Sequence, residues 1–185
     1  MFGQGIPAAL FMALATTVLR FGMSLNLSPS QVIDRANRLI IRDQRSRLFA
    51  TVFLGYLDPA SGAMAFACAG HNPPLLYRAA TRTCESISAE GCAIGVFQNA
   101  VFGEEITHLT PGDLLVLYTD GITEIINADD DEFGEAQLEA LIIANAHLPA
   151  QALTQLILRE INAFAGEEGA ADDETLLIVK RNPAE

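Results

Sequence analysis

Acidic residues stand at the ends of two apolar runs in the second half of the chain. Asp120 follows the run 114–117, and Asp172 comes shortly before the run 176–179. Both runs have the pattern of buried strands. If a sheet brings their ends together, the two carboxylates can both stay ionised only with a cation between them. Oxygen ligands of this kind select hard divalent ions such as Mg²⁺ or Mn²⁺. The pattern therefore indicates a metal site and, through it, hydrolysis.

Each of these motifs also has an ordinary explanation. An Asp-Gly pair after a strand is a common turn, and Asp172-Asp173 before a strand can be a solvated loop. In the metal interpretation, Gly121 lets the backbone turn sharply and approach an ion, and Thr175 hydrogen-bonds a neighbouring carboxylate. Both motifs lie at strand ends, but as long as the fold is unknown this shared position supports a metal site only modestly.

Other acidic and histidine side chains are weaker candidates. His71 lies in the segment Ala-Gly-His-Asn-Pro-Pro. A structural role, in which the histidine fixes this turn, is favoured over a role as a catalytic base or metal ligand. Glu124 is either a second acid that reaches the metal through water or a surface acid, and both stay open. The residues 129–131 indicate a solvated turn, since their spacing is not that of an EF-hand loop.

Composition limits the classes of function. The 185 residues predict one domain with a real core, and a net charge of −12 argues against nucleic acid as partner. The three cysteines form no Cys-x-x-Cys pair and predict reduced thiols in a cytoplasmic protein. The apolar segment 6–19 is short for a membrane span, which predicts a core helix and no membrane insertion. Gly3-Gln4-Gly5 is only a weak anion-binding signal, because no P-loop lysine follows.

The elements that must position these residues follow from periodicity and turn signals. Residues 28–31 have the form of a capping box. The order of helices and antiparallel strands is that of an α+β protein rather than alternating βαβ units. A flexible loop is expected at 166–171. The predicted helices are 8–24, 28–45, 135–146 and 150–164, and the predicted strands are 48–57, 63–69, 75–78, 83–87, 101–109, 114–119 and 174–180.

The order of motifs resembles the metal-dependent serine/threonine phosphatases of the PPM (type 2C) class, in particular the bacterial branch named for the sporulation phosphatase SpoIIE. The resemblance spans nearly the whole chain in the expected order. The segments that carry it are 3–10, 49–53, 69–74, 111–113, 118–124, 133–134 and 172–177.

This resemblance implies an α-β-β-α sandwich formed by a single domain over residues 1–185. It implies two Mn²⁺ or Mg²⁺ ions that activate a water for in-line attack on phosphoserine or phosphothreonine. Asp120 and Asp172 would be the catalytic metal ligands, Asp173 would be non-ligating, and Met1 would offer its backbone carbonyl to a metal. In this branch the substrate is often an anti-sigma-factor antagonist, so a cytoplasmic role in signal transduction is expected.

One departure from the family pattern qualifies this expectation. The metal-bridging aspartate of the family would stand immediately before Met1, and Phe2 occupies the place of a small residue. The family's N-terminal strands also have no counterpart, so we expect a truncated domain with an exposed sheet edge that favours self-association or a homodimer. The alternative function is a degenerate, non-catalytic protein-binding module. A plain divalent-cation-binding domain is a third reading.

We therefore expect the isolated 185-residue chain to bind metal weakly and to hydrolyse phosphate esters poorly. Calorimetric titration of the chain with Mn²⁺ measures this directly. Tight binding of two ions would contradict the expectation.

Overall fold

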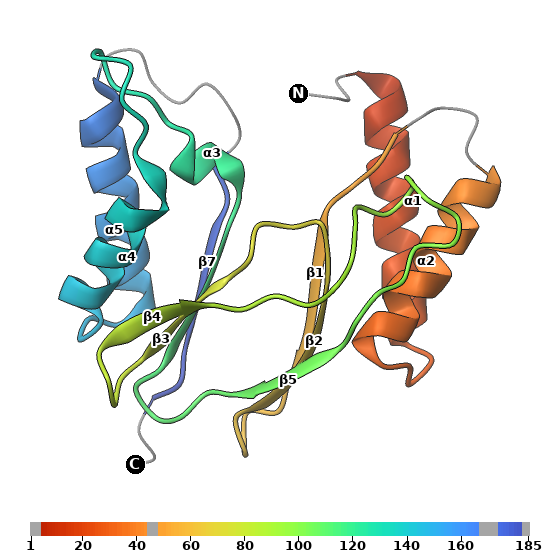
Figure 1. Cartoon of the computed structure of the whole chain (residues 1–185), viewed down its shortest axis with the longest axis horizontal. Helices are drawn as coiled ribbons and strands as arrows, with labels where there is room; N and C mark the ends of the chain where they lie inside the picture. Colours follow the sequence, from red (N-terminus) through yellow and green to blue (C-terminus); the bar gives the residue numbers. More distant parts are fainter. Residues whose placement is uncertain (1–4, 44–47, 167–173, 183–185) are drawn as a thin grey trace. The chain divides into compact units, whose positions relative to one another are not determined.

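The computed structural model describes residues 5–43, 48–166 and 174–182, and the chain divides into two compact units. Unit 1 contains the chain up to His71 together with Ser88–His108, and unit 2 contains Asn72–Ile87 together with the chain from Leu109 onward. Each unit combines helices with one antiparallel sheet (Figure 1). The predicted α+β class is confirmed, and a single domain over 1–185 stays a prediction.

Unit 1 is a three-stranded antiparallel sheet with a helical hairpin. The strand order is β1-β2-β5, and the β1–β2 hairpin pairs Val52 with Ala69 and Leu57 with Met64. The amphipathic helix α2 packs on this sheet and buries Val32, Ile33, Ala36 and Ile40. The elements of unit 1 are α1 (Ile6–Met23), α2 (Pro29–Asp43), β1 (Val52–Leu57), β2 (Ala63–Ala69) and β5 (Glu105–His108).

Helix α1 forms as predicted, but its expected burial as a core helix is wrong. It packs mainly against α2, so only a narrow stripe is covered, including Phe11 and Ala15. The two helices are close at Gly22, where a Cβ would lie 2.9 Å from Val32 Cγ1. By length and composition α1 could cross a membrane, although core helices and signal sequences meet the same criteria. Its exposed apolar residues are Ile6, Leu10, Met12, Leu14, Phe21 and Met23.

The start of α2 is held by its own cap and by a distant acid. Ser28 N–H donates to Gln31 Oε1 at 3.2 Å, as the capping-box prediction requires. Ser30 donates to Glu104 Oε2 from its backbone N–H and from its hydroxyl, at 3.2 and 3.0 Å. Burial alone would raise the pKa of Glu104, but hydrogen bonds from Ser28 and Ser30 outweigh it and lower the pKa. A carboxylate at a helix N-terminus thus ties α2 to the segment before β5.

Unit 2 is a four-stranded antiparallel sheet, in the order β4-β3-β6-β7, with two long helices packed on it (Figure 1). The core lies between the central strand β6 and these helices, where Leu114 and Val116 contact a cluster that includes Leu138 and Ile157. The elements of unit 2 are β3 (Leu75–Arg78), β4 (Thr83–Ser86), β6 (Leu114–Tyr118), α3 (Asp120–Thr123), α4 (Gly134–Asn145), α5 (Ala150–Ala165) and β7 (Leu176–Lys180).

The predicted elements all occur, with differences in length. The runs 48–57 and 101–109 were predicted as long strands, but only 52–57 and 105–108 pair regularly. Apolar residues before each strand are used in other contacts, such as the bridge between Ala50 and Ile94. The sequence pattern did not predict α3, because a single helical turn is too short to show a period. Residues 167–171 of the predicted loop lie outside the described part of the chain.

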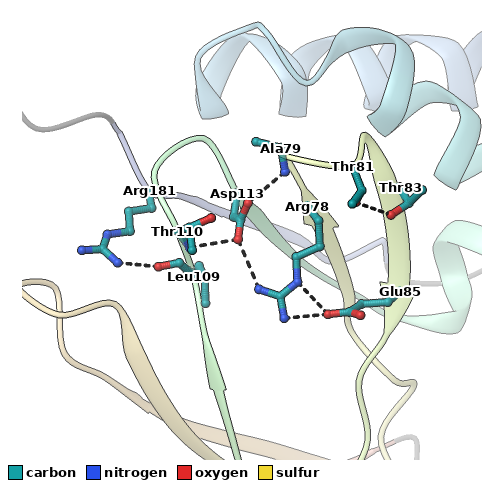
Figure 2. Close-up of polar contacts among 9 residues, drawn as sticks. All are labelled: Arg78, Ala79, Thr81, Thr83, Glu85, Leu109, Thr110, Asp113 and Arg181. Carbon is teal, nitrogen blue, oxygen red and sulfur yellow. Dashed lines mark hydrogen bonds and ion pairs between the residues drawn. The ribbon is translucent and has the colours of Figure 1, made fainter.

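A buried carboxylate fixes the beginning of β6. Asp113 is fully buried and accepts hydrogen bonds from Ala79 N–H and Thr110 N–H, both at 2.9 Å (Figure 2). Arg78 donates to the same carboxylate at 3.2 Å and also pairs with Glu85. Burial alone would raise the pKa of Asp113, but these hydrogen bonds outweigh it and lower the pKa. The charge therefore locks the turn before β6 to the end of β3.

We expect Asp113→Asn to lower the free energy of unfolding at pH 7 by about 2–4 kcal/mol. The asparagine side chain would place its NH₂ group, a donor, against N–H donors that are already buried. The native pKa of Asp113 is lowered, so its contribution is present above the unfolded value of about 3.9 and is lost as the pH falls below it. Urea unfolding at pH 7 and pH 3 should show the difference between variant and wild type shrinking in acid.

The matched control for this experiment is Glu85→Gln. Glu85 is half-exposed and pairs with the same arginine, so its loss should cost less than about 0.5 kcal/mol. An unchanged difference between wild type and Asp113→Asn at both pH values would contradict the assigned role.

Candidate functional site

The pairing of β6 with β7 brings the two acidic segments to one end of the unit 2 sheet. The strands are antiparallel, and their register runs from Leu114 opposite Lys180 to Tyr118 opposite Leu176. The chain beyond the last pair is still joined, because Thr119 N–H donates to Thr175 O at 3.1 Å. Thr175 N–H donates in turn to Thr119 Oγ1 at 3.1 Å. This link, which we call the Thr119–Thr175 clamp, stands immediately before Asp120.

Asp120 is the first residue of α3 and its side chain is exposed. Its Oδ1 accepts a hydrogen bond from Gly121 N–H at 3.0 Å, which orients the carboxylate at the start of the helical turn. The expected sharp turn at Gly121 is wrong. Gly121 is buried inside α3 and is not among the glycines with a positive φ, since the chain leaves β6 by a helical turn.

The other two predicted metal ligands, Asp172 and Met1, lie outside the described residues. In the sequence, Asp172 comes three residues before Thr175, which is one partner of the clamp. The strand pairing is therefore compatible with the predicted meeting of Asp120 and Asp172, which stays a prediction. Within the described part of the chain, no group of three or more His, Cys, Asp or Glu side chains is placed to hold a metal.

A hydrogen bond at the end of β6 connects the candidate site to α4. The hydroxyl of the buried Tyr118 donates to Glu135 Oε2 at 2.6 Å, in the first turn of that helix. Burial, followed by the bond to Glu135, raises the pKa of Tyr118 well above its usual range. Sequence reasoning missed this pair. The only signal was a tyrosine ending an apolar strand with an acid opening the next long helix.

The remaining acidic candidates fall on the surface. Glu124 is exposed at the end of α3, and both interpretations of its role stay open. The acidic run after it forms the expected exposed turn. The side-chain oxygen of Asn127 accepts the backbone N–H groups of Asp129 and Asp131, both at 2.9 Å. This geometry accounts for the acidic run without a metal.

His71 lies in unit 1, in a tight turn that follows β2. Cys68 Sγ donates to the His71 carbonyl at 3.3 Å. Gly70 has a φ of +68°, and a Cβ there would lie 2.7 Å from Ala93 N. The motif thus specifies close backbone packing at Gly70, and the structural role of the His71 side chain stays a prediction.

Comparison with solved structures shows which class of protein has this fold. The SiaA-PP2C domain of Pseudomonas aeruginosa shares the fold, with a TM-score of 0.81 at 20% identity, over 97% of this chain and 72% of that chain. The RsbU and RsbW domains of a Mycobacterium tuberculosis protein superpose with a TM-score of 0.76 at 26% identity, over 98% of this chain and 49% of that chain. The mixed helix and antiparallel sheet fold is that of the PP2C-type phosphatase domains.

The family follows from the sequence comparison. The model of the SpoIIE family, described as stage II sporulation protein E, matches residues 1–182, and the chain belongs to this family. The phosphoserine phosphatase RsbU of Bacillus subtilis (strain 168) is 27% identical over 179 residues, which are 97% of this chain and 53% of RsbU. The chain thus spans about half the length of this relative.

The contribution of the Thr119–Thr175 clamp to stability can be measured by substitution of Thr119. We expect Thr119→Val to remove the acceptor for Thr175 N–H and to cost about 1 kcal/mol, while Thr119→Ser keeps the oxygen and most of the stability. Hydrogen exchange at the Thr175 amide should become about tenfold faster in the valine variant. Equal protection in both variants would show that the side chain does not hold the two strands together.

Proposed function

We propose that this chain is a metal-dependent phosphatase domain that hydrolyses phosphoserine or phosphothreonine in a regulatory protein. The observation that carries the proposal is the Thr119–Thr175 clamp, which joins the residue before Asp120 to the residue before β7. Membership of the SpoIIE family and the phosphoserine phosphatase activity named for RsbU support it.

The donor set suits Mn²⁺ or Mg²⁺. Asp120 is exposed, and one of its oxygens is fixed by Gly121 N–H, which leaves Oδ2 to contact a cation. Asp172 would add a second hard oxygen from the strand-leading segment. When bound, such ions lower the pKa of a water molecule and offset the charge of the phosphoryl group.

The chain's own residues contribute position and charge. The clamp holds the backbone immediately before Asp120, and the bond from Tyr118 to Glu135 fixes the strand end against α4. Two carboxylates at this edge repel a phosphate dianion unless cations neutralise them, so hydrolysis should depend strictly on added metal. The substrate we favour is a phosphorylated anti-sigma-factor antagonist, the chemistry expected in this branch of the family.

Substitution of the proposed ligands tests the function. Asp120→Asn and Asp172→Asn should each lower Mn²⁺-dependent hydrolysis of p-nitrophenyl phosphate and of a phosphoserine peptide by at least about 100-fold, because each removes a charged metal ligand. Asp129→Asn, in the exposed turn, should retain wild-type activity. Thermal unfolding of Asp120→Asn and Asp129→Asn should stay close to that of the wild type, since both side chains are exposed.

Different failures have different meanings. Activity that survives Asp120→Asn would locate the chemistry elsewhere. Metal binding without turnover would favour the plain cation-binding domain. If neither metal binding nor turnover is measurable and the chain still binds a phosphorylated antagonist protein, the non-catalytic binding module is supported instead.

A further inference from the structure

Unit 2 has a cleft at the end of its sheet opposite to Asp120. Its volume is about 810 Å³, and it is lined by the β3–β4 turn, the turn before β6, the end of α4 and the end of β7. Figure 1 shows α3 at one end of this unit and the β3–β4 turn at the other. The five residues of β6 separate the two ends, a span of about 17 Å. A ligand in this cleft is therefore not at the proposed site of hydrolysis.

The side chains that line the cleft are basic or apolar, apart from the amide of Asn182. Arg82, His147 and Lys180 come from three different elements, and Tyr77, Ile143 and Pro149 supply apolar walls. Among the described residues, the lining contains no aspartate or glutamate, in a chain with a net charge of −12 and only 11 Lys and Arg residues. Among the described residues, neither Arg82 nor His147 forms an ion pair with a carboxylate, whereas Arg159 is paired with Glu160.

Lys180 is held in place by the end of α4. Its Nζ donates to Ala146 O and Leu148 O, both at 2.7 Å, so the ammonium group caps carbonyls at the C-terminal end of the helix. Two of its three N–H donors are used in these bonds. The third N–H donor of Lys180 and its positive charge can contact a ligand in the cleft, and β7 and α4 fix their position.

Arg82 occupies a backbone position that does not favour arginine. Its φ is +59°, and its N–H donates to Arg78 O at 2.8 Å to close the β3–β4 turn. Glycine or asparagine would adopt this left-handed conformation at lower cost. The turn packs on Gly112, where a Cβ would lie only 2.9 Å from Ala79 Cβ. An arginine thus lines the cleft from a closely packed turn whose backbone favours a smaller residue.

We propose that this cleft binds a phosphomonoester carried on a small apolar group, and holds it without hydrolysing it. The guanidinium of Arg82 can donate two parallel hydrogen bonds to phosphate oxygens, while Lys180 acts as a point charge and His147 as a further donor. Ile143 and Pro149 offer an apolar surface to the body of the ligand. The convergence of three nitrogen-bearing side chains favours a tetrahedral dianion over a planar carboxylate.

Calorimetric titration of the full chain with phenyl phosphate, in EDTA so that no metal supports hydrolysis, tests the proposal. Wild type should bind, and Arg82→Asn should weaken binding by at least about tenfold. The asparagine suits the left-handed turn, so the thermal midpoint of this variant should equal or exceed that of the wild type. His147→Gln should weaken binding by a smaller factor. Arg159→Gln, which removes an equal charge outside the cleft, and Asp120→Asn should both bind as wild type does.

Four results would overturn the proposal. The first is equal binding by wild type and Arg82→Asn. The second is equal weakening by Arg82→Asn and Arg159→Gln, which would reduce the effect to net charge. The third is binding of benzoate as tight as that of phenyl phosphate, which would exclude the phosphate class. Inorganic phosphate that binds as tightly as phenyl phosphate would remove the role of the apolar walls.

Discussion

The antiparallel pairing of β6 with β7 is the constraint on which the candidate site depends. Side chains in a strand alternate between faces, so a slip of one residue would turn Leu114, Val116 and Tyr118 away from the helices and shift the acid at the strand end. Two polar groups fix the strand against such a slip. The buried Asp113 holds the turn before β6, and the Thr119–Thr175 clamp holds its other end against the start of β7. Register and site geometry are therefore set by the same contacts.

The polar network at Asp113 also shows how an acidic protein uses a buried charge. A carboxylate without partners would be expensive in this position, and here it accepts two backbone N–H groups and an arginine. The carboxylate at position 120 has the opposite environment, exposed and with a single backbone donor. The first environment stabilises the fold, and the second leaves a carboxylate oxygen available to a ligand. Two acids at opposite ends of β6 thus differ in environment, one buried with three donors and one exposed with a single donor.

The sequence predicted a large share of the fold from particular features. Hydrophobic alternation and turn residues located the β1–β2 hairpin, with the strand 63–69 predicted at its observed bounds. The capping box located the start of α2. Helix α1 was placed correctly along the chain, but the core helix expected from its apolar composition is covered only along a narrow stripe. Composition reports that a helix is apolar, whereas burial depends on which elements lie on each of its sides.

For the site, the sequence by itself determined the chemistry of the side chains and their positions at strand ends, because carboxylates after or before apolar runs can be read along the chain. Tertiary structure alone decided which ends meet. It supplied the clamp between Thr119 and Thr175, the bond from Tyr118 to Glu135, and the gathering of Arg82, His147 and Lys180 around one cleft. These contacts join residues far apart in the chain, and local periodicity carries no information on the register between distant strands.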